Sequence, residues 1–190
     1  MCTLSLHDPF LICLKGGPQN HTTAALAVDL KEADTDEFRA YAEKVVDNAR
    51  TLAAGLVARG LDVVSGGTDN HLILLDAASS GLTGRQLSKA LDAAGIVCNY
   101  NTVPFDPRPP ANPSGIRIGT PAITSRGLGA DEMEQLAAWM ARIATVRADE
   151  SLELVDRKAV YREVAAAVRA LCDRFPAPGI RYEGELTAHA

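Results

Sequence analysis

Apolar residues recur at helical spacing through the first third of the chain. An alanine-rich run over residues 21–33 is followed by apolar positions every three or four residues from Phe38 to Leu56. We predict one helix over 21–33 and a longer one that runs to Arg59. Asp34 and Glu37 have the spacing of a capping box and are predicted to open the longer helix. A helix of over 30 Å, at about 1.5 Å per residue, usually bridges two layers or domains.

The pattern then changes to short apolar runs separated by turn residues. Leu61–Ser65 and His71–Leu75 are predicted as two strands, joined by a turn over residues 66–70 that is rich in glycine, asparagine and aspartate. Ile96–Asn99 is predicted as a third strand. Gly115–Gly119 alternates apolar and polar positions and is predicted as a fourth strand.

Helical spacing returns between and after these strands. Thr83 and Gln86 form a second capping box, which predicts the start of another helix. Two further apolar stripes predict helices over residues 133–144, with Asp131 as its cap, and over residues 152–171. Tyr100–Pro113 separates the last two strands and holds five prolines, so it is expected to be more than a connection.

This order of elements predicts an α/β fold with a small, mostly antiparallel sheet, preceded by a helical arm. We expect the arm to cover residues 1–60 and the α/β domain residues 61–176. Residues 177–190 are expected to form a mobile tail. The arm cannot close a core of its own, so we expect it to leave an apolar stripe exposed at Phe38, Val45 and Leu52.

Composition narrows the function classes. The 190 residues are 47% hydrophobic and 23% charged, which is typical of a globular protein. A net charge of -5 argues against nucleic-acid and anionic-membrane partners, and no apolar stretch approaches the roughly 20 residues that span a bilayer. Met1–Leu14 is a poor signal peptide. We therefore expect a cytoplasmic protein with free thiols and no metal site, because its cysteines and histidines lack ligand spacing.

One arginine stands out as candidate chemistry. Arg117 lies between Ile116 and Ile118 in a short strand flanked by Gly115 and Gly119. A guanidinium on such a rigid support suits bidentate binding of a carboxylate. The alternative is an arginine that is ion-paired inside the fold, and this segment alone leaves both interpretations open.

His71 and Asp69 could be taken for an acid–base pair. On a turn followed by an apolar strand, a histidine more often satisfies local backbone groups, and we favour that interpretation.

Three further segments carry a family resemblance together with residues 114–124. They are Gly16-Gly17-Pro18-Gln19-Asn20-His21, then Val64–Leu72, then Asn99–Pro110. In this order and spacing, the set closely resembles the C-terminal half of serine hydroxymethyltransferase, from about Gly16 to about Pro176. That family comprises pyridoxal-phosphate enzymes of fold type I, which interconvert serine and glycine with tetrahydrofolate as one-carbon acceptor.

The resemblance implies roles for individual residues. Arg117 corresponds to the arginine that binds the α-carboxylate of serine or glycine. Gly17 corresponds to the glycine whose N–H contacts the pyridoxal phosphate held by the neighbouring subunit, which implies a homo-oligomer. The positions that contact folate in the family are occupied here by Asn101, Arg108, Pro109 and Pro110. The family commonly has lysine or serine near Arg108.

The resemblance also shows what this sequence lacks. The family's catalytic lysine follows a threonine-rich motif upstream of the Gly-Gly-Pro segment, and none of the lysines here does: Lys15, Lys31, Lys44, Lys89 and Lys158. We therefore expect a truncated or split family member that is inactive alone and pairs with a complementary N-terminal half. The alternatives are a non-catalytic partner subunit or a decaying gene fragment.

Overall fold

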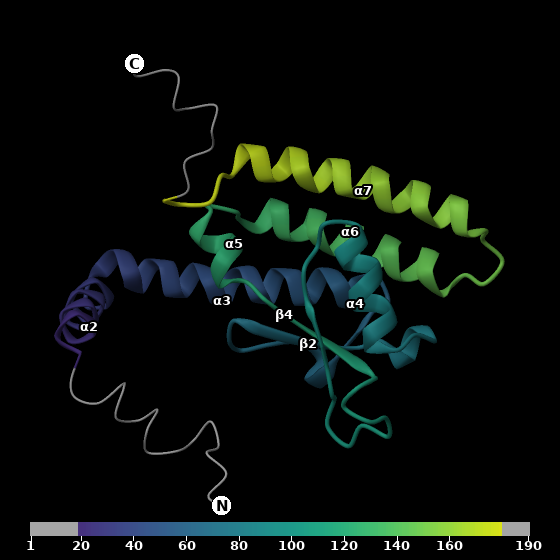
Figure 1. Cartoon of the computed structure of the whole chain (residues 1–190), viewed down its shortest axis with the longest axis horizontal. Coiled ribbons are helices and arrows are strands. Elements are labelled where there is room, and N and C mark those ends of the chain that lie inside the picture. The colour runs from purple at the N-terminus through teal and green to yellow at the C-terminus, as the bar shows by residue number, and fades with distance from the viewer. Residues whose placement is uncertain (1–18, 180–190) are drawn as a thin grey trace, which may run out of the picture. The chain divides into compact units, whose positions relative to one another are not determined.

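A computed structural model describes residues 19–179 of the chain (Figure 1). The contacts between residues divide the chain into two compact units, Met1–Ala40 and Tyr41–Ala190.

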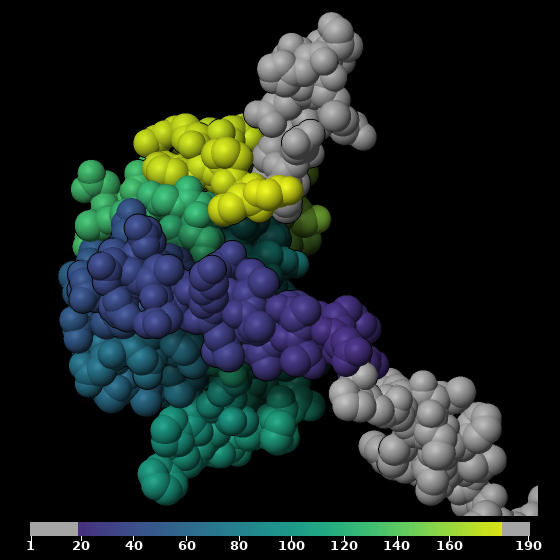
Figure 2. Space-filling model, turned by 90° about the vertical axis from the view of Figure 1, so that its left-hand side faces the viewer, coloured from purple at the N-terminus to yellow at the C-terminus, as the bar shows by residue number. Residues whose placement is uncertain are grey.

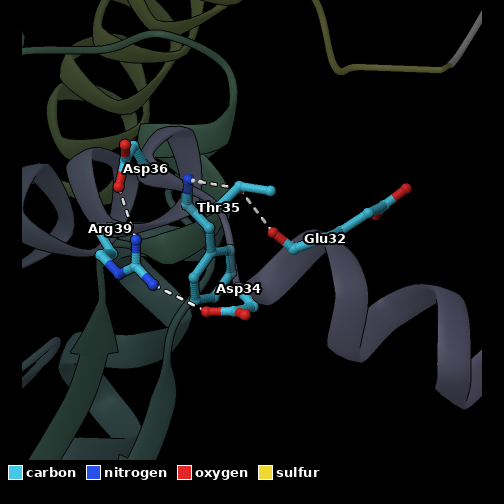
Figure 3. Close-up of polar contacts among 6 residues, drawn as sticks. Glu32, Asp34, Thr35, Asp36 and Arg39 are labelled. Carbon is cyan, nitrogen blue, oxygen red and sulfur yellow. Dashed lines mark hydrogen bonds and ion pairs between the residues drawn. The ribbon is translucent and has the colours of Figure 1, made fainter.

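The first unit contains helix α2 (Asn20–Ala33) and the beginning of helix α3 (Asp36–Ala58). Thr35 caps α3, because its hydroxyl accepts a hydrogen bond from the Phe38 N–H at 3.2 Å and donates one to the Glu32 carbonyl at 2.7 Å (Figure 3). The predicted capping box of Asp34 and Glu37 is therefore wrong. The carboxylate of Asp34 instead pairs with Arg39 at 2.8 Å, as Figure 3 shows.

The second unit is built on a four-stranded antiparallel sheet. Its strands are β1 (Asp62–Val63), β2 (Leu72–Asp76), β3 (Asn99–Asn101) and β4 (Gly115–Gly119), in the order β1-β2-β4-β3. The strand predicted at residues 96–99 is displaced toward the C-terminus, and only Asn99 of it belongs to β3. Gly95 has a φ of 80° and the Ile96 N–H donates to the Leu91 carbonyl at 2.9 Å, so the chain there is still leaving the preceding helix.

Four helices follow β2 in the sequence: α4 (Gly84–Ala93), α5 (Pro121–Ser125), α6 (Ala130–Ala148) and α7 (Leu154–Arg174). Two short 3-10 turns lie at Val64–Gly66 and Ala78–Ser80. The capping box of Thr83 and Gln86 is confirmed, with bonds of 2.9 and 3.1 Å. Asp131 is not the cap of α6. Gly129 holds that position, and its N–H donates to Glu132 at 2.9 Å.

The core lies between one face of the sheet and the helices α3, α4, α6 and α7. Ile73 and Leu75 of β2 and the isoleucines of β4 are buried there. Figure 1 shows α6 and α7 running side by side, which agrees with their contacts. The expected exposed stripe on α3 is wrong at two positions, because Val45 and Leu52 are only 6% and 3% exposed. Both side chains are covered within the second unit.

These elements confirm the predicted α/β class with a small antiparallel sheet and packed helices. The boundary at residue 60 stays a prediction, and most of the predicted tail lies outside the described residues. Within residues 19–179, none of the helices is both long and apolar enough to span a membrane.

Candidate functional site

Arg117 occupies the middle of β4, which lies between β2 and β3 in the sheet. Its neighbours Ile116 and Ile118 point into the core, so the alternation of the strand places Arg117 on the opposite, solvent-facing side. Leu74 of β2 and Asn99 of β3 lie directly opposite Arg117 in the ladder. Three paired strands therefore fix the position of its backbone.

A surface depression of about 420 Å³ lies on this face of the sheet. Arg117 and Asn101 both line it, so the structure brings together two of the residues that the sequence analysis singled out. The β1–β2 connection supplies most of the remaining wall. The hydroxyl of Thr68 donates to the Leu72 carbonyl at 2.6 Å, and the side chain of Asn70 accepts from the Leu72 N–H at 2.7 Å. These bonds shape the turn that borders the depression.

Arg117 and Asn101 both retain binding capacity. Among residues 19–179, the Arg117 guanidinium has no ion pair or hydrogen bond. The described part of the chain therefore contains no partner for Arg117, and it does not support the interpretation of Arg117 as an ion pair within the fold. Asn101 donates one hydrogen bond, to the neighbouring Thr102 carbonyl at 2.8 Å. Its side-chain oxygen accepts none from the described residues and is available to a ligand.

The proline-rich segment after β3 is organised around one carboxylate. Asp106 accepts hydrogen bonds from the N–H groups of Val103, Arg108 and Ser114 and from the Ser114 hydroxyl, at 2.7 to 3.2 Å. Desolvation raises the pKa of Asp106, but these four hydrogen bonds together outweigh it and lower the pKa to about 2. The carboxylate thus fixes both ends of the segment. Sequence reasoning missed this role, although an aspartate between prolines is a common turn signal.

The predicted folate residues divide into two groups. Asn101 lines the depression, whereas Arg108, Pro109 and Pro110 are exposed on the proline-rich segment and do not line it. Figure 2 shows this teal segment projecting at the bottom of the view. Phe105 also lies here, fully exposed and with a φ of 58°, which is uncommon for a bulky residue.

Two glycines allow β4 to lie close to its neighbours, Gly84 on the side of α4 and Gly115 on the side of β2. A Cβ on Gly84 would lie 1.9 Å from the carbonyl oxygen of Gly115, and a Cβ on Gly115 would lie 2.7 Å from the Leu75 carbonyl oxygen. The Gly84 N–H also donates to the Pro113 carbonyl at 2.8 Å. This close approach holds β4, and with it Arg117, against the helical layer.

Several other predictions fall elsewhere. Gly17 lies outside the described residues, so its assignment stays a prediction. The exposed side chain of His71 makes no hydrogen bond within the described part of the chain, and the preference for a local backbone role is therefore wrong. Of the cysteines, Cys98 and Cys172 are described and are free. Burial raises the pKa of Cys98 to about 11, so its thiol stays protonated at neutral pH.

Comparison with known proteins identifies a family whose members resemble this chain. Residues 6–140 match the family model described as serine hydroxymethyltransferase. The chain is 58% identical over 167 residues to the serine hydroxymethyltransferase of Acidothermus cellulolyticus, and 55% identical over 168 residues to that of Sorangium cellulosum. That of Teredinibacter turnerae is 46% identical over 165 residues.

These alignments cover 87–88% of the chain but only 38–39% of each relative. The chain thus spans less than two fifths of the length of the curated relatives that it matches. The family model alone nevertheless covers well over half of the 190 residues. The chain belongs to the serine hydroxymethyltransferase family.

Proposed function

We propose that this chain supplies the amino-acid and folate side of a serine hydroxymethyltransferase site. The reaction transfers the hydroxymethyl carbon of serine to tetrahydrofolate and yields glycine and 5,10-methylenetetrahydrofolate. The observation that carries the proposal is the Arg117 guanidinium, which has no partner among the described residues and lies in a depression that it shares with Asn101.

In this proposal Arg117 binds the α-carboxylate of serine or glycine. A planar guanidinium offers two parallel N–H donors to a carboxylate and thereby fixes its orientation as well as its position. Pairing with β2 and β3 holds the strand rigid beneath the side chain. The substrate is therefore oriented by a group whose backbone does not have to rearrange on binding.

Asn101 and the proline-rich segment are proposed to contact tetrahydrofolate. The free oxygen of Asn101 accepts a hydrogen bond from the pterin, and Arg108, Pro109 and Pro110 extend this surface. The hydrogen bonds to Asp106 hold the segment in place without any ligand.

Pyridoxal phosphate is the cofactor implied by the family. Gly17, which the resemblance assigns to its phosphate, lies outside the described residues. The Arg117 guanidinium and the Asn101 side-chain oxygen have no partner among residues 19–179 and fit the amino acid and folate. When bound, pyridoxal phosphate acts as an electron sink for the amino acid. In this proposal, Gly17 donates its N–H to the cofactor phosphate in a neighbouring subunit of a cytoplasmic homo-oligomer.

The 190 residues alone are proposed to have negligible turnover. None of the five lysines follows a threonine-rich motif of the kind that holds the family's catalytic lysine. In this proposal, activity requires pairing with a complementary segment. The second candidate is a non-catalytic partner subunit or gene fragment, and it rests on the same lack of a lysine in a threonine-rich motif.

A chimera tests this proposal. The matching C-terminal segment of the Acidothermus cellulolyticus relative, to which the chain is 58% identical, is replaced by this chain. We expect formation of glycine and methylenetetrahydrofolate from serine, with the isolated chain as the inactive control. A chimera that folds and binds pyridoxal phosphate but gives no turnover would favour the non-catalytic candidate.

A further inference from the structure

Three basic side chains from three helices surround a second depression, of about 320 Å³, remote in sequence from the sheet site. Lys89 of α4, Arg147 of α6 and Arg157 of α7 line it together with Tyr161. The remaining lining residues are Gln86, Ala90 and Leu154, so no carboxylate is among them. The three helices contact one another, and this fixes the backbone positions from which the three basic side chains extend.

Two polar atoms at this depression lack partners. The hydroxyl of Tyr161 and the Nε of Arg157 are buried and make no hydrogen bond to the part of the chain that the structure describes. Leaving a buried donor unpaired costs free energy, and the cost is larger for a charged group. An acceptor oxygen bound in the depression would remove that cost once the side chains turn these donors toward it.

The cations are also largely free. Within residues 19–179, Lys89 and Arg147 form no ion pair. Arg157 donates one hydrogen bond, from a terminal nitrogen to the backbone carbonyl of Asp149. The nearby carboxylate of Asp149 is occupied by the N–H and hydroxyl of Ser151, at 2.9 and 2.6 Å. It balances only part of the positive charge.

We propose that this depression binds a phosphate group, free or carried on a small organic molecule. A phosphate monoester brings a charge of about -1.5 to -2 and three acceptor oxygens, which suits three cations and a hydroxyl donor better than the single charge of a carboxylate. Burial raises the pKa of Tyr161, although Arg147 and Arg157 oppose this. The hydroxyl therefore keeps its proton at neutral pH and acts as a donor.

The test titrates the 190-residue chain with inorganic phosphate, phenyl phosphate and benzoate at constant ionic strength. Backbone amide shifts in the NMR spectrum report both affinity and location. We expect saturable shifts at residues 86–90, 147 and 154–161 with inorganic or phenyl phosphate, and not with benzoate. Tighter binding of phenyl phosphate would identify an organic phosphate as the ligand class, and equal binding would identify the free ion.

Variants separate a built site from general surface charge. Lys89→Gln combined with Arg147→Gln is expected to weaken phosphate binding at least tenfold. Tyr161→Phe keeps every charge and is expected to weaken it about tenfold through the lost hydrogen bond. Arg162→Gln combined with Arg169→Gln removes two exposed charges of α7 outside the depression and is the matched control.

The titrations and the control variant give three outcomes that would overturn the proposal. They are the absence of saturable shifts at these residues, equal binding of benzoate and phenyl phosphate, and an equal loss of affinity in the control variant. Unchanged affinity of Tyr161→Phe would also contradict it, because the hydroxyl would then not meet the anion.

Discussion

A single side chain, Arg117, connects the sheet to the proposed chemistry. Its partner-free guanidinium means that a substitution there removes no ion pair from the described fold. A substitution of Arg117 is therefore expected to weaken substrate binding without lowering the stability of the fold. A substitution of a structural arginine would lower that stability.

Arg117→Lys in the active chimera keeps the charge but loses the planar fork. We expect serine binding to weaken by about 1.5–3 kcal/mol, the range for hydrogen bonds to charged groups, with pyridoxal-phosphate binding and melting temperature unchanged. Serine titrations of wild type and variant measure this. Arg85→Lys, at an exposed position of α4, is the control. A lower melting temperature with intact serine affinity would instead assign Arg117 a structural role.

Asp106 predicts an acid-sensitive segment. Its pKa of about 2 lies below the ordinary value of 3.8, so the carboxylate stabilises the folded segment fully above pH 3.8 and loses this effect as pH falls through 2. We expect the amide signals of Val103, Arg108 and Ser114 to shift together with a midpoint near pH 2 in NMR spectra. Asp106→Asn should abolish this step, and a midpoint near 4 in the wild type would contradict the proposed bonds.

The sequence predicted the structural roles of residues best where neighbouring side chains alone determine those roles. The capping box at Thr83 follows from two side chains three positions apart, and the alternation of Gly115–Gly119 follows from the pleat. The shared depression of Arg117 and Asn101 depends on the pairing of β3 with β4, which no local pattern specifies. The anchoring by Asp106 likewise joins residues up to eight positions apart through backbone groups.

At the scale of elements, the start of α4 lies in close contact with β4 at Gly84. Gly84→Ala would place its Cβ 1.9 Å from the Gly115 carbonyl oxygen, a backbone atom that cannot rotate away. We expect the free energy of unfolding to fall by about 1–3 kcal/mol, the usual cost of overpacking, or by more. Urea denaturation measures the loss.

Gly67→Ala is the matched control, because Gly67 has an extended φ of 169° and no atom within 4 Å of a Cβ. We expect little change in its stability. Equal losses for the two variants would mean that the approach of α4 to β4 does not decide the result, because a Gly→Ala change by itself lowers the entropy of the unfolded chain and stabilises the fold.

Element boundaries were harder to predict than element types. No helix is predicted from the sequence at α5, although Pro121 stands at its first position, where proline is favoured. The start of β3 was placed too early because Ile96 and Val97 form an apolar pair. Those two residues instead belong to the segment in which the chain leaves α4 after Gly95.

At the scale of the whole molecule, burial differs sharply along the helical part of the chain. No residue of α2 is buried, whereas α3 buries seven from Val45 to Leu56. Leu26 and Leu30, one helical turn apart, are 54% and 62% exposed. Exposed apolar pairs of this kind favour association between copies.

Leu26→Lys combined with Leu30→Lys is therefore expected to reduce self-association of the 190-residue chain. Sedimentation velocity measures it, with the melting temperature as the check that the second unit is intact. The control is Ala24→Lys with Asp29→Lys, which also changes exposed positions of α2 but leaves both leucines. A wild-type chain that sediments as a monomer would contradict this prediction.

The strand order β1-β2-β4-β3 also affects how the chain is made. During synthesis β1 and β2 emerge together and can pair as a hairpin, but β4, which covers the other edge of β2, begins 39 residues after β2 ends. At about 5–20 residues per second, the ribosome leaves that edge unpaired for roughly two to eight seconds. Unpaired strand edges are templates for pairing with other chains. The newborn protein should therefore depend most on chaperones in this interval, after residue 76 has emerged and before residue 119 has.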